Sequence, residues 1–134
     1  MTDDTRHSRI YVYNSLFYTK LTESCNEKEG FELVKRWTKN VDIFERDFLV
    51  IPINLLNHWS LVVVVRPSLC MEESNDDTID LNAHKSCIMF MDSLGLHRAN
   101  TIGRKIRAYL AHEWVCVSLI CYYHLISSRY VTLY

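Results

Sequence analysis

The fold is decided by the stretch Asn57-His58-Trp59-Ser60-Leu61-Val62-Val63-Val64-Val65 and by a second apolar stretch, Cys87-Ile88-Met89-Phe90-Met91-Asp92-Ser93-Leu94. Runs of β-branched and other apolar residues of this length predict buried strands. A histidine opens the first run, and an aspartate closes the second. If the two strands are neighbours, His58 and Asp92 meet at one rim of a sheet. There, a carboxylate can orient an imidazole that acts as a general base.

Size and composition predict one modest globular domain. The chain has 134 residues, of which 49% are apolar and three are glycine, which suits a packed core. Its net charge of −1 gives no global attraction to nucleic acid or to an anionic membrane. No apolar stretch reaches the roughly 18 to 20 residues of a spanning helix. We therefore expect neither of these partners.

Cysteine usage bears on the compartment. Five cysteines are irregularly spaced, and the N-terminus is polar with two acidic residues. This start does not match a secretory signal, and an odd number of cysteines argues for free thiols in a reducing compartment. We expect a nuclear or cytoplasmic protein without a cofactor. Cys116, Cys121 and His124 match no established metal-site spacing, so we expect no metal and interpret the two cysteines as buried structural thiols.

The first half of the chain carries mixed patterns. Residues 9–21 are aromatic-rich and fit a strand or a short helix equally well. Apolar residues from Phe31 to Val41 recur at helical spacing, which predicts an amphipathic helix with Trp37 packed in the core. Residues 48–53 read as a buried strand, in which Pro52 indicates an edge position or the end of the strand.

The second half predicts a loop, a helix and an apolar end. Residues 70–86 include an acidic stretch too poor in apolar residues to pack, so we expect a surface insertion loop. A second helix follows, capped by Asn100 or Thr101. Its apolar face consists of Ile102, Ile106, Tyr109, Leu110 and Trp114. Residues 115–123 are β-prone and nearly uncharged, which is an aggregation risk unless they pair into the sheet.

Four short sequence motifs occur here in the same order as in one protein family. They are Val34-Lys35-Arg36-Trp37-Thr38-Lys39-Asn40-Val41-Asp42-Ile43-Phe44, then Asp47-Phe48-Leu49-Val50-Ile51-Pro52-Ile53-Asn54, then His58-Trp59, then Met91-Asp92-Ser93-Leu94. This sequence resembles the catalytic domain of the sentrin/SUMO-specific cysteine proteases, also called ubiquitin-like proteases. Residues 14–21 resemble the segment before the first helix. The acidic insertion is similar to that of the branch that trims poly-SUMO chains.

The resemblance implies roles for three residues. His58 would be the catalytic base, and Asp92 the group that orients it. Trp59 would roof the narrow channel that admits the Gly-Gly tail of SUMO, because an indole buried beside the histidine excludes branched side chains. Core packing is the alternative role of Trp59. Taken alone, a histidine at the head of a strand and an aspartate that caps a turn are commonly structural.

The departures from the family concern the nucleophile. The family's catalytic cysteine lies in a motif that contains a glutamine followed by aspartate-cysteine-glycine. This chain contains no glutamine and no Cys-Gly pair. The leucine-asparagine-aspartate word expected before residue 14 is also missing. The resemblance thus implies residues 1–13 as a lead-in, 14–114 as a partial catalytic domain with the 70–86 loop, and 115–134 as a divergent apolar tail.

Three functional hypotheses follow. The first is a SUMO-specific cysteine peptidase by descent, here without its nucleophile and inactive alone. The second is a non-catalytic SUMO-binding module or decoy, and the third is a fragment without autonomous function. The resemblance implies SUMO or SUMO-conjugated proteins as partners of a monomer. The predicted fold class is α+β, an incomplete papain-like fold with a small mixed sheet and flanking helices.

Overall fold

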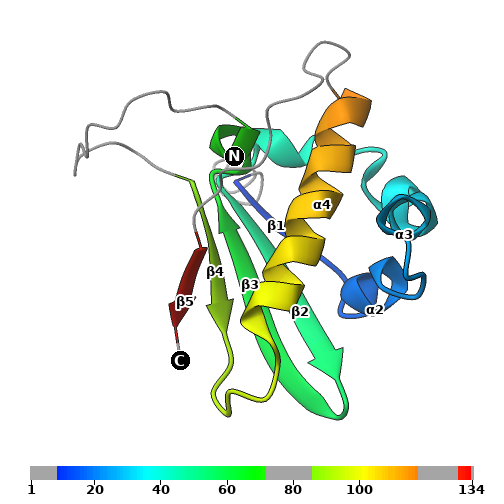
Figure 1. Ribbon diagram of the computed structural model, residues 1–134. Coiled ribbons are helices and arrows are strands. Elements are labelled where there is room, and N and C mark those ends of the chain that lie inside the picture. Colours follow the sequence, from blue (N-terminus) through cyan, green and yellow to red (C-terminus); the bar gives the residue numbers. More distant parts are fainter. Residues whose placement is uncertain (1–8, 72–85, 118–129, 134) are drawn as a thin grey trace, which may run out of the picture.

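A computed structural model describes residues 9–71, 86–117 and 130–133 as an α+β fold (Figure 1). Its sheet has the strand order β1-β2-β3-β4-β5. The strands are β1 (Ile10–Val12), β2 (Phe48–Leu55), β3 (His58–Val65), β4 (Cys87–Met91) and β5 (Tyr130–Leu133). β2, β3 and β4 are antiparallel neighbours, whereas β1 and β5 pair in parallel with β2 and β4. The predicted mixed sheet and fold class are confirmed.

A tight hairpin joins the two longest strands. Between β2 and β3 only Leu56 and Asn57 are left over, and both have positive φ angles, 54° and 60°. Two consecutive positive φ values are typical of the two-residue turns whose twist matches that of paired strands. Asparagine tolerates this conformation well, and Leu56 projects into solvent, 97% exposed. The turn fixes the register Leu55↔His58, so His58 stands at the very end of the hairpin.

The proline in β2 lies where the strand is open on one side. β1 pairs with β2 only as far as Val50, two residues before Pro52. Pro52 still faces Leu61 on β3. Because proline has no N–H to donate, it fits a strand segment whose outer side has no partner. Within the described structure, Pro52 therefore lies in the part of β2 that pairs on one side only, although β2 as a whole lies between β1 and β3.

The helices lie on one face of the sheet, where the core forms. α4 (Ala99–Val117) crosses that face in Figure 1, with α2 (Phe17–Leu21) and α3 (Glu27–Val34) beside it. The structure also describes three short 3₁₀ helices, η1 (Lys35–Thr38), η2 (Ile43–Glu45) and η3 (Pro67–Met71). Asn26 caps α3 by accepting hydrogen bonds from the amides of Lys28 and Glu29. The fully buried core includes Phe17, Val34, Leu49, Ile51, Ile53, Val62, Val64, Ile106 and Leu110.

Three local predictions about the helices are wrong. The helix expected through Val41 ends at Val34 and tightens into η1. Trp37, expected in the core, is 41% exposed and packs beside Phe17 with ring centroids 6.1 Å apart. α4 begins at Ala99, so Asn100 and Thr101 lie inside its first turn and do not cap it. The open choice for residues 9–21 resolves into both alternatives, β1 and then α2.

The segments at the margins are described only in part. Val115–Val117, expected to be β-prone, instead continue α4 three residues past Trp114. The acidic part of the 70–86 loop and most of the 115–134 tail, including Cys121 and His124, fall outside the described residues. Among the described residues, no helix is both long and apolar enough to cross a membrane.

Candidate active site

His58 and Asp92 meet at the rim of the sheet where the β2–β3 hairpin turns and β4 ends, which is the lower end of the sheet in Figure 1. His58 opens β3, and Asp92 directly follows β4. β3 and β4 are antiparallel, with Leu61 opposite Met91. Side chains alternate along a strand, so His58 shares the helix-covered face with the buried Val62, and Asp92 shares it with the buried Phe90. His58 Nε2 lies 2.5 Å from Asp92 Oδ1.

Asp92 is held in place by the turn that follows it. Its Oδ1 accepts hydrogen bonds from the amides of Leu94 and Gly95, both at 3.1 Å, and its Oδ2 accepts one from the amide of His97 at 2.8 Å. Gly95 has φ 61°, a conformation that costs glycine little. The carboxylate side chain is fully buried, and its oxygens are satisfied by donors from three backbone amides and one imidazole.

These contacts keep Asp92 ionised. Burial alone would raise the pKa of Asp92. The hydrogen bonds from the His97 amide, the His58 ring and the Leu94 amide, with the attraction of His58, more than offset it and hold the pKa well below the ordinary aspartate range. An ionised Asp92 can only accept, so His58 Nε2 carries the hydrogen of the shared bond. The other ring nitrogen, Nδ1, makes no hydrogen bond to any residue in the described part of the chain and is the free proton acceptor of the site.

His97 is a site residue that the sequence pattern did not reveal. Its Nε2 lies 3.1 Å from the Leu55 carbonyl oxygen, to which it donates, so its Nδ1 accepts from the Ser60 hydroxyl at 2.7 Å. The His97 ring packs edge-on against His58, with centroids 4.8 Å apart. These contacts join residues 37 and 42 positions apart. The only signal in the sequence was a second histidine five residues after Asp92.

The same three side chains include the ligand types of a metal site. One ligand atom from each of His58, Asp92 and His97 lies within 4.8 Å of the others. Yet both nitrogens of His97 already have protein partners, and His58 Nε2 already binds the carboxylate. A metal would have to displace these hydrogen bonds, so the cluster is built as a hydrogen-bond network.

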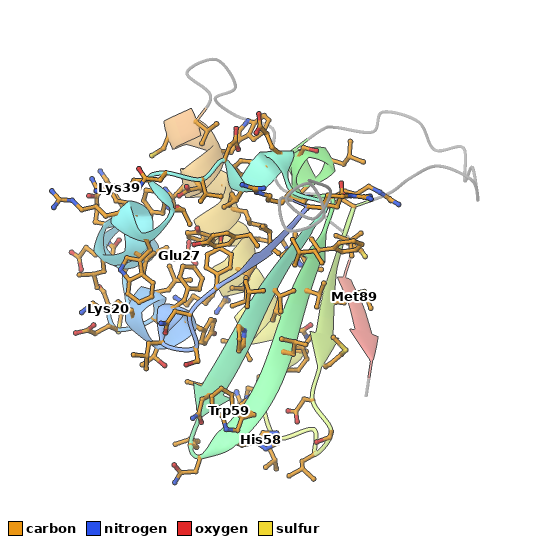
Figure 2. All side chains as sticks on the ribbon, turned by 180° about the vertical axis from the view of Figure 1, so that it is seen from behind. Lys20, Glu27, Lys39, His58, Trp59 and Met89 are labelled. Atoms are coloured by element: carbon orange, nitrogen blue, oxygen red, sulfur yellow. The ribbon has the colours of Figure 1, made fainter. Side chains whose placement is uncertain are left out.

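Trp59 differs from its expected setting. It was expected to be buried beside the histidine, whether in the core or over a channel, but it is 56% exposed. It alternates with His58 and therefore points to the opposite face of the sheet. Figure 2 shows both side chains at the same end of the β2–β3 hairpin. The structure thus offers an exposed indole at the rim beside the His58–Asp92 pair.

None of the described cysteines is placed to serve His58. Cys87 begins β4, at the opposite end from Asp92. Cys70 bonds to the Ser86 hydroxyl at 2.5 Å, and Cys25 is exposed between α2 and α3. Cys116, expected to be buried, is exposed at the end of α4. Burial raises the pKa of the Cys70 and Cys87 thiols. Partial desolvation at the end of α4, together with the charge of Glu113, raises the pKa of the Cys116 thiol, and a raised pKa is the reverse of what activates a nucleophile.

A separate hollow lies away from this rim. It has a volume of about 520 Å³ between α3, η1 and the last turns of α4, and its lining includes Lys35, Lys39 and the buried Glu113. Thr38 donates a hydrogen bond to Glu113 at 2.7 Å. The hollow contains no part of the His58–Asp92 pair, so the candidate site rests on the rim and not on this depression.

The chain matches one known protein family over most of its length. The sequence pattern of the "Ulp1 protease family, C-terminal catalytic domain" matches residues 1–118. "Probable ubiquitin-like-specific protease 2A" of Arabidopsis thaliana is 34% identical over 114 residues, 79% of this chain but 14% of that protein. "Sentrin-specific protease 3" of Homo sapiens is 49% identical over 61 residues, 46% of this chain and 10% of that protein. The chain therefore spans a small part of these relatives' length.

Solved structures share the fold. A de-sumoylating protease superposes with a TM-score of 0.72 at 23% identity, covering 95% of this chain and 44% of the other. The C-terminal Ulp1 protease domain, solved in complex with Smt3, the yeast ortholog of SUMO, gives a TM-score of 0.62 at 22% identity and covers 93% and 47% of the two chains. The matched part of this chain thus corresponds to somewhat less than half of each solved chain.

Proposed function

This chain belongs to the Ulp1 protease family, C-terminal catalytic domain, and on that basis we propose that it forms the histidine–aspartate part of a SUMO-specific cysteine peptidase. The reaction is cleavage of the peptide or isopeptide bond after the Gly-Gly tail of SUMO. The observation that carries this proposal is the 2.5 Å contact between His58 Nε2 and the ionised Asp92. An imidazole fixed in this way is oriented to take a proton on Nδ1.

The chemistry requires a thiol that meets Nδ1 of His58. A free thiol has a pKa of about 8.5 and is mostly protonated at neutral pH. Transfer of its proton to His58 gives a thiolate, which attacks the carbonyl carbon of the last glycine. His58 then returns the proton to the leaving amine, and water hydrolyses the thioester. Because none of the described cysteines lies at His58, we propose that the 134 residues alone do not turn over substrate.

Trp59 supports the choice of substrate. Its indole is exposed at the rim next to His58, where it can lie against an extended tail. A flat ring over a glycine backbone makes close contact that a branched side chain would prevent. We assign Trp59 to the binding of the Gly-Gly tail, with SUMO or SUMO-conjugated proteins as partners.

A non-catalytic SUMO-binding module is the second candidate. It is favoured by the same two observations, an exposed indole at the rim and the lack of a thiol beside His58 in the described segments. Such a module holds SUMO without cleaving it. The likeness to the poly-SUMO-trimming branch is part of the proposal. We also propose that the protein is a monomer in the nucleus or cytoplasm. We propose that it has no nucleic-acid or membrane partner, which the net charge of −1 supports.

Measurements on the purified chain separate these readings. A cooperative thermal melt by circular dichroism tests whether the chain folds, and the lack of one would support a fragment without function. Titration with labelled SUMO tests binding, and a SUMO with a C-terminal electrophile tests for a reactive thiol. We expect binding, no adduct and no hydrolysis of a SUMO C-terminal reporter. A covalent adduct would overturn the claim that this chain lacks a nucleophile, and a folded chain that ignores SUMO would overturn the proposed substrate.

A further inference from the structure

His97 is bonded to the residues that surround His58. Its Nε2 donates to the carbonyl oxygen of Leu55 at 3.1 Å, and Leu55 pairs directly with His58 across the β2–β3 hairpin. Its Nδ1 accepts from the hydroxyl of Ser60 at 2.7 Å, and Ser60 lies on the same face of β3 as His58. Its amide donates to Oδ2 of Asp92 at 2.8 Å. His97 thus holds both strands of the hairpin and the carboxylate that binds His58.

The ring of His97 also lies against the ring of His58. Their centroids are 4.8 Å apart and their planes meet at 67°, an edge-to-face arrangement. The His58 side chain is only 13% exposed, so this contact is made within the packed rim of the sheet. Because two hydrogen bonds tie the His97 ring to two different strands, the ring presents a fixed surface to His58.

The bond to Asp92 alone does not fix the orientation of the His58 ring. A single hydrogen bond sets the position of Nε2, but the ring can still turn about the line from Nε2 to the carboxylate. Such a turn moves Nδ1 away from the position in which it meets a thiol. Misplacement of a catalytic group by about 1 Å can cost about 10²-fold in rate. The His58 ring therefore needs a second contact, and the His97 ring supplies it.

His97 is suited to positioning and not to proton transfer itself. Both of its ring nitrogens already have protein partners, so neither is free to take the proton of a thiol. In this hydrogen-bond pattern the His97 ring carries one proton, on Nε2, and is neutral. His58 becomes positively charged when it accepts a proton, and a second charged ring at this distance would repel it. A neutral neighbour avoids that repulsion.

We infer that His97 is a positioning residue, whose ring holds the His58 ring in the orientation that points Nε2 at Asp92 and leaves Nδ1 to meet the thiol. This inference rests on the proposed function. The His97 amide assists from the other side. Burial raises the pKa of Asp92, and the His97 amide makes the largest single contribution that lowers it. The amide remains in every side-chain variant, so substitutions at His97 test the ring and its two hydrogen bonds.

Two substitutions separate positioning from a purely stabilising role. His97→Gln keeps an amide group that can replace both hydrogen bonds of the ring, but it has no ring beside His58. His97→Phe keeps a flat ring and loses both hydrogen bonds. His112→Ala is the matched control, because His112 is also a half-buried histidine packed on an aromatic ring. Its partner is Phe31, with centroids 5.4 Å apart, and it lies on α4.

The mobility of the His58 ring is measured by ¹³C NMR relaxation of its ring C–H groups in the purified chain. Order parameters of about 0.85 indicate a rigid group, and values below about 0.6 a flexible one. Thermal melts by circular dichroism report the stability of the same variants. Because these order parameters report fast local motion, a change in global stability alone does not alter them.

We expect a rigid His58 ring in the parent chain and in His112→Ala. His97→Gln should melt like the parent but have a flexible His58 ring, with an order parameter below about 0.6. His97→Phe should melt at a lower temperature, because it leaves two polar groups without their partner, and should keep the His58 ring closer to the parent's rigidity.

A rigid His58 ring in His97→Gln would overturn the inference, whatever the stability of that variant. A ring that is equally mobile in His97→Gln and His97→Phe would overturn it too, because a ring at this position would then not limit the motion. The same holds if His112→Ala loosens His58 as much as His97→Gln does. If one of the two His97 variants fails to fold, the other decides.

The proposed function is read out separately by titration of the same variants with labelled SUMO. Trp59 points to the opposite face of the sheet, so the His97 variants should bind SUMO like the parent chain. A folded parent chain that ignores SUMO would overturn the proposed substrate, whatever the His58 ring does. SUMO binding together with a rigid His58 ring in His97→Gln would overturn the positioning role alone.

Discussion

Replacement of Trp59 by alanine should weaken SUMO binding substantially. Trp59 is 56% exposed beside the His58–Asp92 pair. A tryptophan buries about 150–250 Å² in a packed contact, so about 80–140 Å² is left for a ligand to cover. At about 25 cal/mol per Å², this covering contributes about 2–3.5 kcal/mol. The Kd for SUMO should therefore rise by about 30- to 400-fold.

Trp37 provides the matched control. It has a similar exposure of 41% but lies in η1, and Figure 2 places Lys39, two residues further along the chain, far from Trp59. Trp37→Ala should leave the Kd within twofold. Fluorescence anisotropy of labelled SUMO at fixed salt measures both variants against the parent chain. A Trp59→Ala variant that binds as tightly as the parent, or an equal loss in Trp37→Ala, would refute the assignment of the indole to the tail.

Three further perturbations have defined outcomes. Gly30→Ala should lower the free energy of unfolding by about 1–3 kcal/mol in urea titrations, because a Cβ at this position would overlap the Leu21 carbonyl oxygen; a neutral result would contradict this packing. Glu113→Gln should raise the free energy of unfolding at pH 8. Burial and the charge of Asp42 raise the pKa of Glu113, and the Thr38 hydrogen bond only partly opposes them, so the ionised form destabilises the fold. The gain in stability should therefore vanish as the pH falls below about 4.3. The pKa of Asp92 is lowered, so its contribution to the free energy of unfolding depends on pH in the opposite way. That contribution is present above about pH 4 and is lost as the pH falls further. Asp92→Asn should flatten that acid limb, and an unchanged limb would show that other groups produce it.

The sequence predicted the strands and the site pair better than the helix ends. His58 and Asp92 could be placed because each marks the end of a continuous apolar run, and the period of a strand assigns them to one face. The hairpin turn fixes the rest of their geometry. The same reasoning missed His97, since its partners Ser60 and Leu55 become neighbours only when β3 is paired with β4 and the following turn folds back.

The errors at Trp37 and Trp59 have a common cause. Trp37 was predicted to pack in the core, and Trp59 to be buried beside His58 as a channel roof or in the core, because large aromatic side chains usually bury most of their area. The spacing that puts Trp37 on the apolar face assumes an α-helix through Val41, and the chain instead tightens into a 3₁₀ turn at Lys35, which rotates Trp37 outward. Trp59 follows the strand period correctly, but it falls on the face that the described residues leave bare. Periodicity assigns a face and does not reveal whether anything covers it.

The contacts that form the site join residues at very different separations along the chain. His58 is set by a turn of two residues, whereas its bonds to Asp92 and the bracing of Ser60 by His97 close loops of 34 and 37 residues. Loop closure of this kind is slow compared with hairpin formation. The hairpin should therefore form early, and the imidazole should gain its carboxylate only when β4 docks. The time at which the native NMR signal of the His58 ring appears during refolding would then report the last stage of folding.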